Sequence, residues 1–173
     1  ALGHFVAHRP GATSCPLDVC DRGEVRAVAD AILADGPLDL VVYCAGHFRE
    51  QSADGFDLDE MLRHQEVNYL GALHVAHAVM PSLLREGRGH LSLLGSVAGY
   101  RGLPRSLGYG PTKAALIHFA QSLYLELKPR GIGVSIVNPG FVDTPLTAQN
   151  RFPMPAMISP AEAARHMLRG WSA

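Results

Sequence analysis

LDLVVYCAG, residues 38–46, is a short continuous apolar run with β-branched side chains at its centre that stops at a glycine. This form is typical of a strand that is buried on both faces of a sheet. Two later stretches have the same form, HLSLLGS at 90–96 and GVSIVNPG at 133–140. The sequence therefore predicts buried strands at these three places.

Helical patterns separate the predicted strands. We expect helices over residues 22–35, 58–85, 109–128 and 160–169. Asp21 is placed to cap the first, and Pro81 predicts a kink or break in the second. Ser159 and Glu162 form a capping box around Pro160 at the start of the last helix. Alternating strands and helices indicate a mainly parallel sheet with crossover helices.

Composition excludes several classes of protein. The chain has 173 residues, of which 47% are hydrophobic, so we expect one domain over 1–173 with one substantial core. The net charge is −1, and the thirteen Arg and two Lys form no basic cluster, which argues against nucleic acid or membrane partners. No apolar run approaches the roughly 18 residues of a membrane-spanning helix, and no signal peptide pattern is visible. A soluble cytoplasmic protein is expected.

The cysteines indicate neither a disulfide framework nor a metal site. Cys15, Cys20 and Cys44 are odd in number and lack C-x-x-C spacing. We expect reduced, mostly buried thiols, and no metal.

Ligands of open parallel sheets bind beyond the carboxyl ends of the strands. The residues at those ends are Gly46, Ser96 and the pair Pro139 and Gly140. The sequence therefore predicts a site where these three strand ends meet.

Tyr109 and Lys113 stand four residues apart at the predicted start of a helix, so their side chains share one face. Spacing alone proves little, because Tyr124 and Lys128 have the same interval near the end of that helix, where a cation favours the helix terminus. Position separates the two pairs, since the first follows Ser96 by thirteen residues. We interpret Tyr109 and Lys113 as functional and the second pair as structural.

Simple electrostatics make a proton-transfer function plausible for Tyr109. Lowering the pKa of a phenol from about 10 to 7 or 8 needs roughly 3 to 4 kcal/mol, and an ammonium about 4 Å away supplies about that amount. A tyrosine tuned by Lys113 could exchange a proton with a carbonyl or alcohol oxygen. Ser96 could donate a hydrogen bond to the same oxygen.

Five motifs occur in order along the chain: YCAG at 43–46, VNYLG at 67–71, GSVAG at 95–99, YGPTK at 109–113 and NPGFVDTP at 138–145. Together they resemble the short-chain dehydrogenase/reductase family, and the resemblance runs from about Leu17 to the end. It implies a Rossmann-like, doubly wound, mainly parallel sheet with helices on both faces. The implied reaction is hydride transfer between NAD(P) and an alcohol or carbonyl substrate.

The resemblance also implies roles for single residues. Tyr109 would be the acid/base, Lys113 would lower its pKa and bind the nicotinamide ribose, Ser96 would position the substrate oxygen, and Asn68 would hold a proton-relaying water. The residues implied to bind the cofactor are Asp18, Val19, Ala45, Gly46, Tyr109, Lys113, Pro139, Gly140, Val142 and Thr144. Of these, Asp18 would lie at the adenine.

The chain departs from the family pattern in several places. The opening strand with its glycine-rich turn T-G-x-x-x-G-x-G, which binds the pyrophosphate, is absent, as is the strand after the last helix. Without the first strand the sheet would expose apolar edges, so we expect that the sequence omits parts of a longer chain. Arg9 would then lie where the family recognises a 2′-phosphate, which weakly favours NADP. Pro111 requires that the helix begin within about three residues of Tyr109.

Two functions remain open from the sequence. The first is the oxidoreductase, and the alternative is a non-enzymatic binding or scaffold subunit that lacks the nucleotide-binding half. The length of the expressed protein would discriminate between them, because a considerably longer chain with the glycine turn restored supports the enzyme.

Two further expectations concern partners. The apolar residues Phe141, Met154, Met157 and Ile158 either pack as core or, as the family resemblance implies, belong to a mobile lid over the substrate. If they form a lid, the substrate is expected to be apolar. The apolar residues on more than one face of the long helices predict a homodimer or homotetramer.

Overall fold

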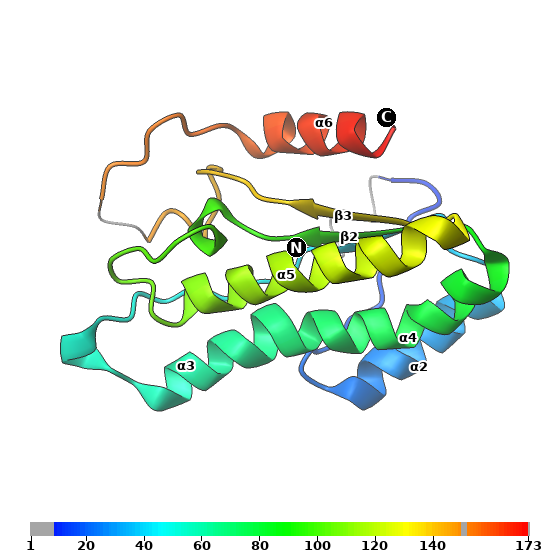
Figure 1. The fold of residues 1–173 in the computed structure, drawn as a ribbon, viewed down its shortest axis with the longest axis horizontal. Helices are drawn as coiled ribbons and strands as arrows, with labels where there is room; N and C mark the ends of the chain where they lie inside the picture. The colour runs from blue at the N-terminus through cyan, green and yellow to red at the C-terminus, as the bar shows by residue number, and fades with distance from the viewer. Residues whose placement is uncertain (1–8, 150–151, 173) are drawn as a thin grey trace.

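The computed structural model describes residues 9–149 and 152–172. In this part of the chain three parallel strands form one sheet, β1 (Leu40–Tyr43), β2 (His90–Leu94) and β3 (Gly133–Val137), in that order. Leu93 at the centre pairs with Tyr43 on one side and with Ile136 on the other. The three strands lie where the sequence predicts them, and their carboxyl ends meet at one edge of the sheet (Figure 1).

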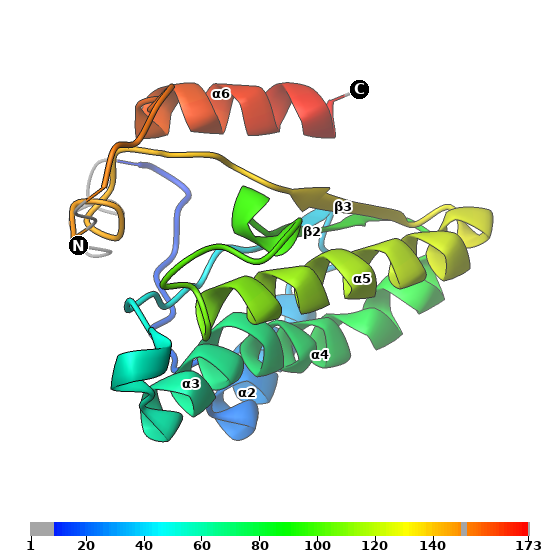
Figure 2. The same cartoon turned by 60° about the vertical axis from the view of Figure 1, so that its left-hand side comes forward.

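The helices form layers on both faces of the sheet. They are α2 (Arg22–Ala34), α3 (Leu58–His64), α4 (Gly71–Glu86), α5 (Tyr109–Leu127) and α6 (Pro160–Trp171). Figures 1 and 2 show α4 and α5 side by side below the sheet, α2 against α4, and α6 above the sheet. None of the helices in the described ranges is long and apolar enough to cross a membrane.

The main core lies between the sheet and the helix pair α4 and α5. Leu91 and Leu93 of β2 are fully buried on that face, as are Ala72 of α4 and Leu116 of α5. Small residues along α4 allow close approach to its neighbours, while each buried leucine contributes about 1.5 to 3 kcal/mol. The other members of this core are Tyr43, Ala76, Val79, Leu83, Ala120, Leu127, Ile132 and Val134.

The opposite face of β2 carries a polar contact with α6. Ser92 is fully buried, and its hydroxyl oxygen accepts hydrogen bonds from Trp171 Nε1 and from Ser135 Oγ, both at 3.0 Å. The end of α6 is thereby attached to the centre of the sheet.

The prediction that 38–46 is buried on both faces is wrong. Leu40 and Val42 are 38% and 36% exposed, whereas Tyr43 is buried. β1 is one of the two edge strands of the described sheet, and α4 and α5 cover only its face that carries Tyr43. The exposed apolar edge expected from the missing first strand is therefore present.

The helix boundaries mostly confirm the sequence pattern. Asp21 caps α2 through bonds from the Gly23 and Glu24 amides, and α6 has the expected capping box, although it runs two residues beyond 169. α5 begins at Tyr109, as Pro111 requires. These boundaries fix where the functional side chains project.

The predicted break before Pro81 is wrong. α4 continues through Pro81. Proline has no N–H to pair with the carbonyl of His77, but His77 is on the exposed side of the helix, where water can bond to that carbonyl. The irregularity lies instead at Gln65–Leu70, a π-helical segment (η2) between α3 and α4 that contains Asn68. Such segments are frequent at functional sites.

Candidate active site

Most of the predicted site residues line one cavity beyond the carboxyl ends of the strands. Its volume is about 520 Å³, and residues of α6 close its far side. The predicted residues that line it are Gly46, Ser96, Tyr109, Lys113, Pro139, Gly140, Val142 and Thr144. The structure thus brings together side chains from four separate segments of the chain.

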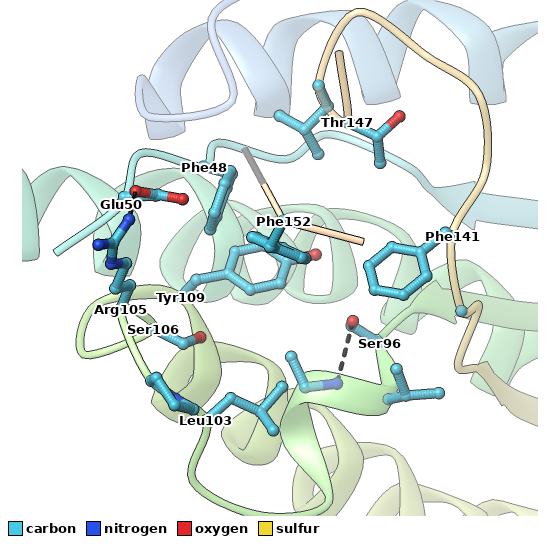
Figure 3. Close-up of a pocket in the computed structure, with 15 residues that line it drawn as sticks. Phe48, Glu50, Ser96, Leu103, Arg105, Ser106, Tyr109, Phe141, Thr147 and Phe152 are labelled. Carbon is cyan, nitrogen blue, oxygen red and sulfur yellow. Dashed lines mark hydrogen bonds and ion pairs between the residues drawn. The ribbon is translucent and has the colours of Figure 1, made fainter. Parts of the chain in front are cut away.

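A smaller pocket of about 150 Å³ opens beside this cavity. Its lining includes the aromatic residues Phe48, Phe141 and Phe152 around Tyr109 (Figure 3). Ser96 and Tyr109 line both spaces, together with Gly140, Leu146 and Thr147. The serine and tyrosine therefore lie at the junction of a large cavity and a small apolar pocket.

Tyr109 occupies the first position of α5, with the ring of Phe48 edge-on at 5.2 Å between centroids. Burial raises the pKa of its phenol, while a hydrogen bond with Ser96 lowers it, and the net shift is upward. The expectation of a lowered tyrosine pKa is therefore wrong for the protein alone. Desolvation disfavours the phenolate more than its neighbours stabilise it.

Lys113 lies one turn further along α5 and is only 3% exposed. Its Nζ donates a hydrogen bond of 2.8 Å to the carbonyl oxygen of Leu94 and lies 5.5 Å from the centroid of the Tyr109 ring. Burial lowers the pKa of Lys113 to about 8. The ammonium is therefore directed at the end of β2 and across the face of the tyrosine ring.

The second tyrosine and lysine pair differs in its surroundings. Lys128 Nζ lies 5.1 Å from the centroid of the Tyr124 ring, much as in the first pair, but Lys128 is exposed. A hydrogen bond with Tyr124 raises its pKa. Burial and the cavity, rather than the spacing, distinguish the two pairs.

Ser96 is held at the end of β2 by its neighbours. Its amide donates to Asn138 Oδ1 at 3.0 Å, and its hydroxyl oxygen accepts from the Ala98 amide at 3.2 Å. A Cβ on Gly95 would lie 2.0 Å from Asn138 Oδ1, so a side chain there would displace Asn138 from its bond with the Ser96 amide. Because Ser96 Oγ accepts from Ala98, its O–H is the group that pairs with Tyr109 at the wall of the cavity.

Asn68 lies behind the cavity and links three parts of the site. It is fully buried; Oδ1 accepts from the His47 amide at 2.7 Å, and Nδ2 donates to the His47 carbonyl at 2.9 Å and to Thr112 Oγ1 at 3.1 Å. Thr112 in turn donates to the carbonyl of Tyr109 at 2.7 Å. The side chain therefore braces the segment after β1 against the first turn of α5.

Other predicted cofactor residues lie outside the lining of this cavity. Asp18 is exposed, and hydrogen bonds with Cys20 lower the pKa of its carboxyl group. Val19 packs at Gly71, and Ala45 packs against the main core. Arg9 accepts a bond from the Ala12 amide through its carbonyl, in the turn that opens the described chain.

The cysteines are free, as predicted, but the prediction that they are mostly buried is wrong. Cys15 and Cys44 are exposed and Cys20 is partly buried. Cys44 follows the last residue of β1 and lines the large cavity, so its exposure has the same cause as that of Gly46. Cys15 lies in an irregular segment before α2.

His47, Glu60 and His64 have side-chain atoms within 4.8 Å of one another, which is close enough for a metal site. Both ring nitrogens of the buried His64 are engaged, Nδ1 with the Glu60 carbonyl at 2.7 Å and Nε2 with the Arg49 amide at 3.1 Å. Burial lowers the pKa of His64, and His47 Nε2 contacts the Glu60 carboxylate. We interpret the group as a hydrogen-bonded brace beneath the segment that carries Phe48.

Sequence reasoning missed much of the small pocket. Phe48 and Phe152 were not predicted, and neither were Glu50 and Arg105. The one available signal was that Phe48 and Glu50 closely follow Gly46 at a strand end. Of the predicted lid, Phe141 lines the pocket and packs against Phe152 with centroids 6.0 Å apart.

The other lid residues do not line the small pocket. Ile158 pairs with Val142 in an isolated bridge, Met157 is 43% exposed, and Met154 is partly buried. The segment is therefore joined to the chain after β3, and its aromatic residue rather than its methionines contacts the pocket.

Comparisons with known proteins agree with this geometry. The family described as "short chain dehydrogenase" matches residues 2–154. An uncharacterized oxidoreductase from Myxococcus xanthus (strain DK1622) is 37% identical over 135 residues, which are 78% of this chain and 53% of that protein. The chain thus spans about half the length of the curated relatives it matches.

Solved structures show the same fold. The structure described as "ElxO with NADP Bound" matches 97% of this chain and 74% of its own, with a TM-score of 0.87 and 22% identity. A gluconate 5-dehydrogenase from Burkholderia cenocepacia J2315, in complex with NADP and tartrate, matches 78% of this chain and 55% of its own, with a TM-score of 0.73 and 27% identity. The parallel sheet, the strand-end cavity and the match over most of the chain place this protein in the short-chain dehydrogenase family.

Proposed function

We propose that the protein is an NAD(P)-dependent oxidoreductase that transfers a hydride between the nicotinamide and a small alcohol or carbonyl substrate. One observation carries the proposal: Ser96 and Tyr109 lie where the large strand-end cavity meets the small apolar pocket. A cofactor in the first space and a substrate in the second would meet at these two hydroxyl groups.

The large cavity fits the nicotinamide half of such a cofactor. Gly140 leaves open space, since a Cβ there would meet no atom within 4 Å. Lys113 presents a buried nitrogen at the same wall, where it could bind ribose hydroxyl groups. The bound cofactor would supply or accept the hydride, and the 173 residues contain no glycine-rich turn for its pyrophosphate.

The proton would be exchanged by Tyr109. Its raised pKa keeps the phenol neutral at neutral pH, which suits donation to the oxygen of a carbonyl undergoing reduction. Ser96 would donate a second hydrogen bond to that oxygen by turning its O–H from Tyr109 to the substrate. Lys113 would hold the cofactor, and Asn68 would set the position of Tyr109 through Thr112. A water held at Asn68 remains part of the proposal.

NADP is the cofactor we propose in preference to NAD. Two solved structures with this fold contain NADP. Arg9 remains the candidate for the 2′-phosphate, as do Asp18 and Val19 for the adenine and Ala45 for its ribose. Comparing kcat/KM for NADPH and NADH, in the natural protein and in Arg9→Gln, tests the preference. Equal values for both cofactors would refute it.

We also propose that two or more copies associate, in the cytoplasm, through the outer face of α5. Leu116 and Ala120 are buried in the core of the chain and cannot form an interface, but Leu125 is 72% exposed and Tyr124 is 40% exposed. Solution scattering at micromolar concentration tests this association, and a monomer would remove the proposal.

Turnover is tested with a panel of apolar alcohols and ketones and each nicotinamide cofactor. Tyr109→Phe should abolish turnover and leave cofactor affinity within a few-fold, because the phenyl ring keeps the packing against Phe48. If the protein binds neither cofactor and turns over no substrate, the binding or scaffold alternative is supported.

A further inference from the structure

Glu50 and Arg105 form a charged end to the mostly apolar small pocket. Arg105 Nη1 donates to Glu50 Oε2 at 3.3 Å. The other carboxylate oxygen, Oε1, is buried and has no hydrogen-bond partner. It is the one buried side-chain nitrogen or oxygen atom without a partner in the described part of the chain. Figure 3 shows the carboxylate between the Arg105 guanidinium and the ring of Phe48.

The two residues are held in place by the backbone around them. The Gln51 amide donates to the Arg105 carbonyl at 3.1 Å, and Gln51 and Ser106 form an isolated parallel bridge. Arg105 has a left-handed backbone conformation with φ of 57°, which is unfavourable for a residue with a side chain. The paired segments therefore keep Glu50 and Arg105 at this end of the pocket despite that cost.

An unpartnered buried acceptor is unfavourable until a donor reaches it. The torsion that orients a glutamate carboxylate is soft, so Oε1 can turn toward a molecule in the pocket. A cavity of about 150 Å³ with apolar walls is large enough for one benzene ring. A compact ring-sized ligand can therefore carry this donor.

Charge decides which kind of donor fits. Arg105 already balances the charge of Glu50, so a cationic ligand would bring an unbalanced charge into an apolar space. A neutral hydroxyl group satisfies the oxygen without this penalty.

We propose that the small pocket selects carbonyl substrates that carry one ring-sized apolar group with a hydroxyl group that donates to Glu50. The proposal rests on the proposed function for the reacting end of the substrate. It adds that Glu50 is the residue that determines specificity at the other end.

The test measures binding of acetophenone ligands to the protein by calorimetry without cofactor, so that no turnover occurs. The 3- and 4-hydroxy compounds are compared with their methyl counterparts, which have similar size. We expect the better hydroxy compound to bind about tenfold more tightly than its methyl counterpart, because its hydroxyl group pairs with a charged acceptor. Equal affinities, or no binding of any of these ligands, would overturn the proposal.

Variants identify the acceptor. Glu50→Met should reduce the preference to less than twofold, and Glu50→Gln, which keeps one acceptor oxygen, should retain part of it. Arg105→Gln is the matched control, since it breaks the same ion pair but leaves the carboxylate, and it should keep the preference. Melting curves establish that each variant is folded. A preference that survives in both Glu50 variants would also refute the assignment.

Turnover separates this proposal from the proposed function. If hydroxy ketones bind through Glu50 but no ketone is reduced with either cofactor, the oxidoreductase assignment fails and the specificity site stands. If ketones are reduced but Glu50→Met leaves the preference for hydroxyl groups unchanged, the specificity site fails and the oxidoreductase assignment stands.

Discussion

Lys113 Nζ donates a hydrogen bond of 2.8 Å to the main-chain carbonyl of Leu94, the last residue of β2. This bond joins the first turns of α5 to the strand end that carries Ser96. It also places a cation in a site where only 3% of the residue is exposed. The positioning of the candidate site and the cost of its buried charge therefore depend on the same side chain.

The first prediction concerns stability and pH. Burial lowers the pKa of Lys113 from 10.5 to about 8 in the folded chain, so between these values the unfolded chain binds more protons. The free energy of unfolding therefore rises as the pH increases from about 8 toward 10, by up to about 3 kcal/mol. Above pH 10 the raised pKa values of Tyr43 and Tyr109 oppose this trend.

Lys113→Met should flatten this rise, as measured by urea unfolding at several pH values. Lys128→Met is the matched control, because that lysine also lies over a tyrosine ring but is exposed. The control should leave the slope between pH 8 and 10 intact. A natural protein whose stability is independent of pH over this range would contradict the burial of a titrating Lys113.

The second prediction concerns the pH dependence of turnover. Because the pKa of Tyr109 is raised above 10, its phenolate fraction increases about tenfold per pH unit at lower pH. The kcat/KM for alcohol oxidation should rise with a log slope near one from pH 7 to 9, while carbonyl reduction, which uses the neutral phenol, stays nearly level. An oxidation plateau below pH 8 would contradict the raised pKa and would support the lowering by Lys113 that the sequence argument expected.

That contrast shows where sequence reasoning succeeds and where it stops. The three strand ends and the start of α5 follow from local patterns, and parallel strands necessarily bring Gly46, Ser96 and Gly140 to one edge. The pKa of Tyr109 depends on how much water reaches its ring, which no spacing reveals. The charge of Lys113, considered without burial, therefore gave the wrong direction for the shift in the pKa of Tyr109.

The small pocket was harder to predict for a different reason. Glu50 and Arg105 are 55 residues apart, and their contact depends on loop geometry and a left-handed residue. Phe152 reaches the pocket from a segment after β3 whose course follows no periodic pattern. The exposure of β1 likewise depends on which elements cover it, which the strand's own sequence does not specify.

The third prediction tests Asn68 as a positioning residue. Asn68→Ala removes three hydrogen bonds from a fully buried position and should lower the free energy of unfolding by about 3 kcal/mol. Thr112→Val removes the next link, to the carbonyl of Tyr109. In a double-mutant cycle the two changes should couple by about 1 kcal/mol.

The same cycle applies to turnover. Because Asn68 acts through Thr112 on the first turn of α5, either change should lower kcat more than it raises KM. Additive effects on both stability and kcat would show that Asn68 supports the segment at His47 alone and does not position Tyr109.

The last prediction uses glycines to separate the fold from the cleft. A Cβ on Gly99 would lie 2.7 Å from the carbonyl carbon of Lys113 and 2.9 Å from the Ala114 nitrogen. Both are backbone atoms of α5, which cannot yield as a side chain can. Gly99→Ala should therefore displace α5 from the turn after Ser96, lower stability by about 1 to 3 kcal/mol and reduce turnover.

Gly140→Ala should have the opposite profile. A Cβ there meets no atom within 4 Å, so the melting temperature should change little. Gly140 nevertheless lines both the large cavity and the small pocket. The added methyl group enters the space where cofactor and substrate would meet, and KM should rise. Gly102→Ala is the control for both measurements, because a Cβ on Gly102 also meets no atom within 4 Å and Gly102 lines neither the large cavity nor the small pocket. If Gly140→Ala binds and turns over its ligands like the control, the junction at Ser96 and Tyr109 is not where they meet.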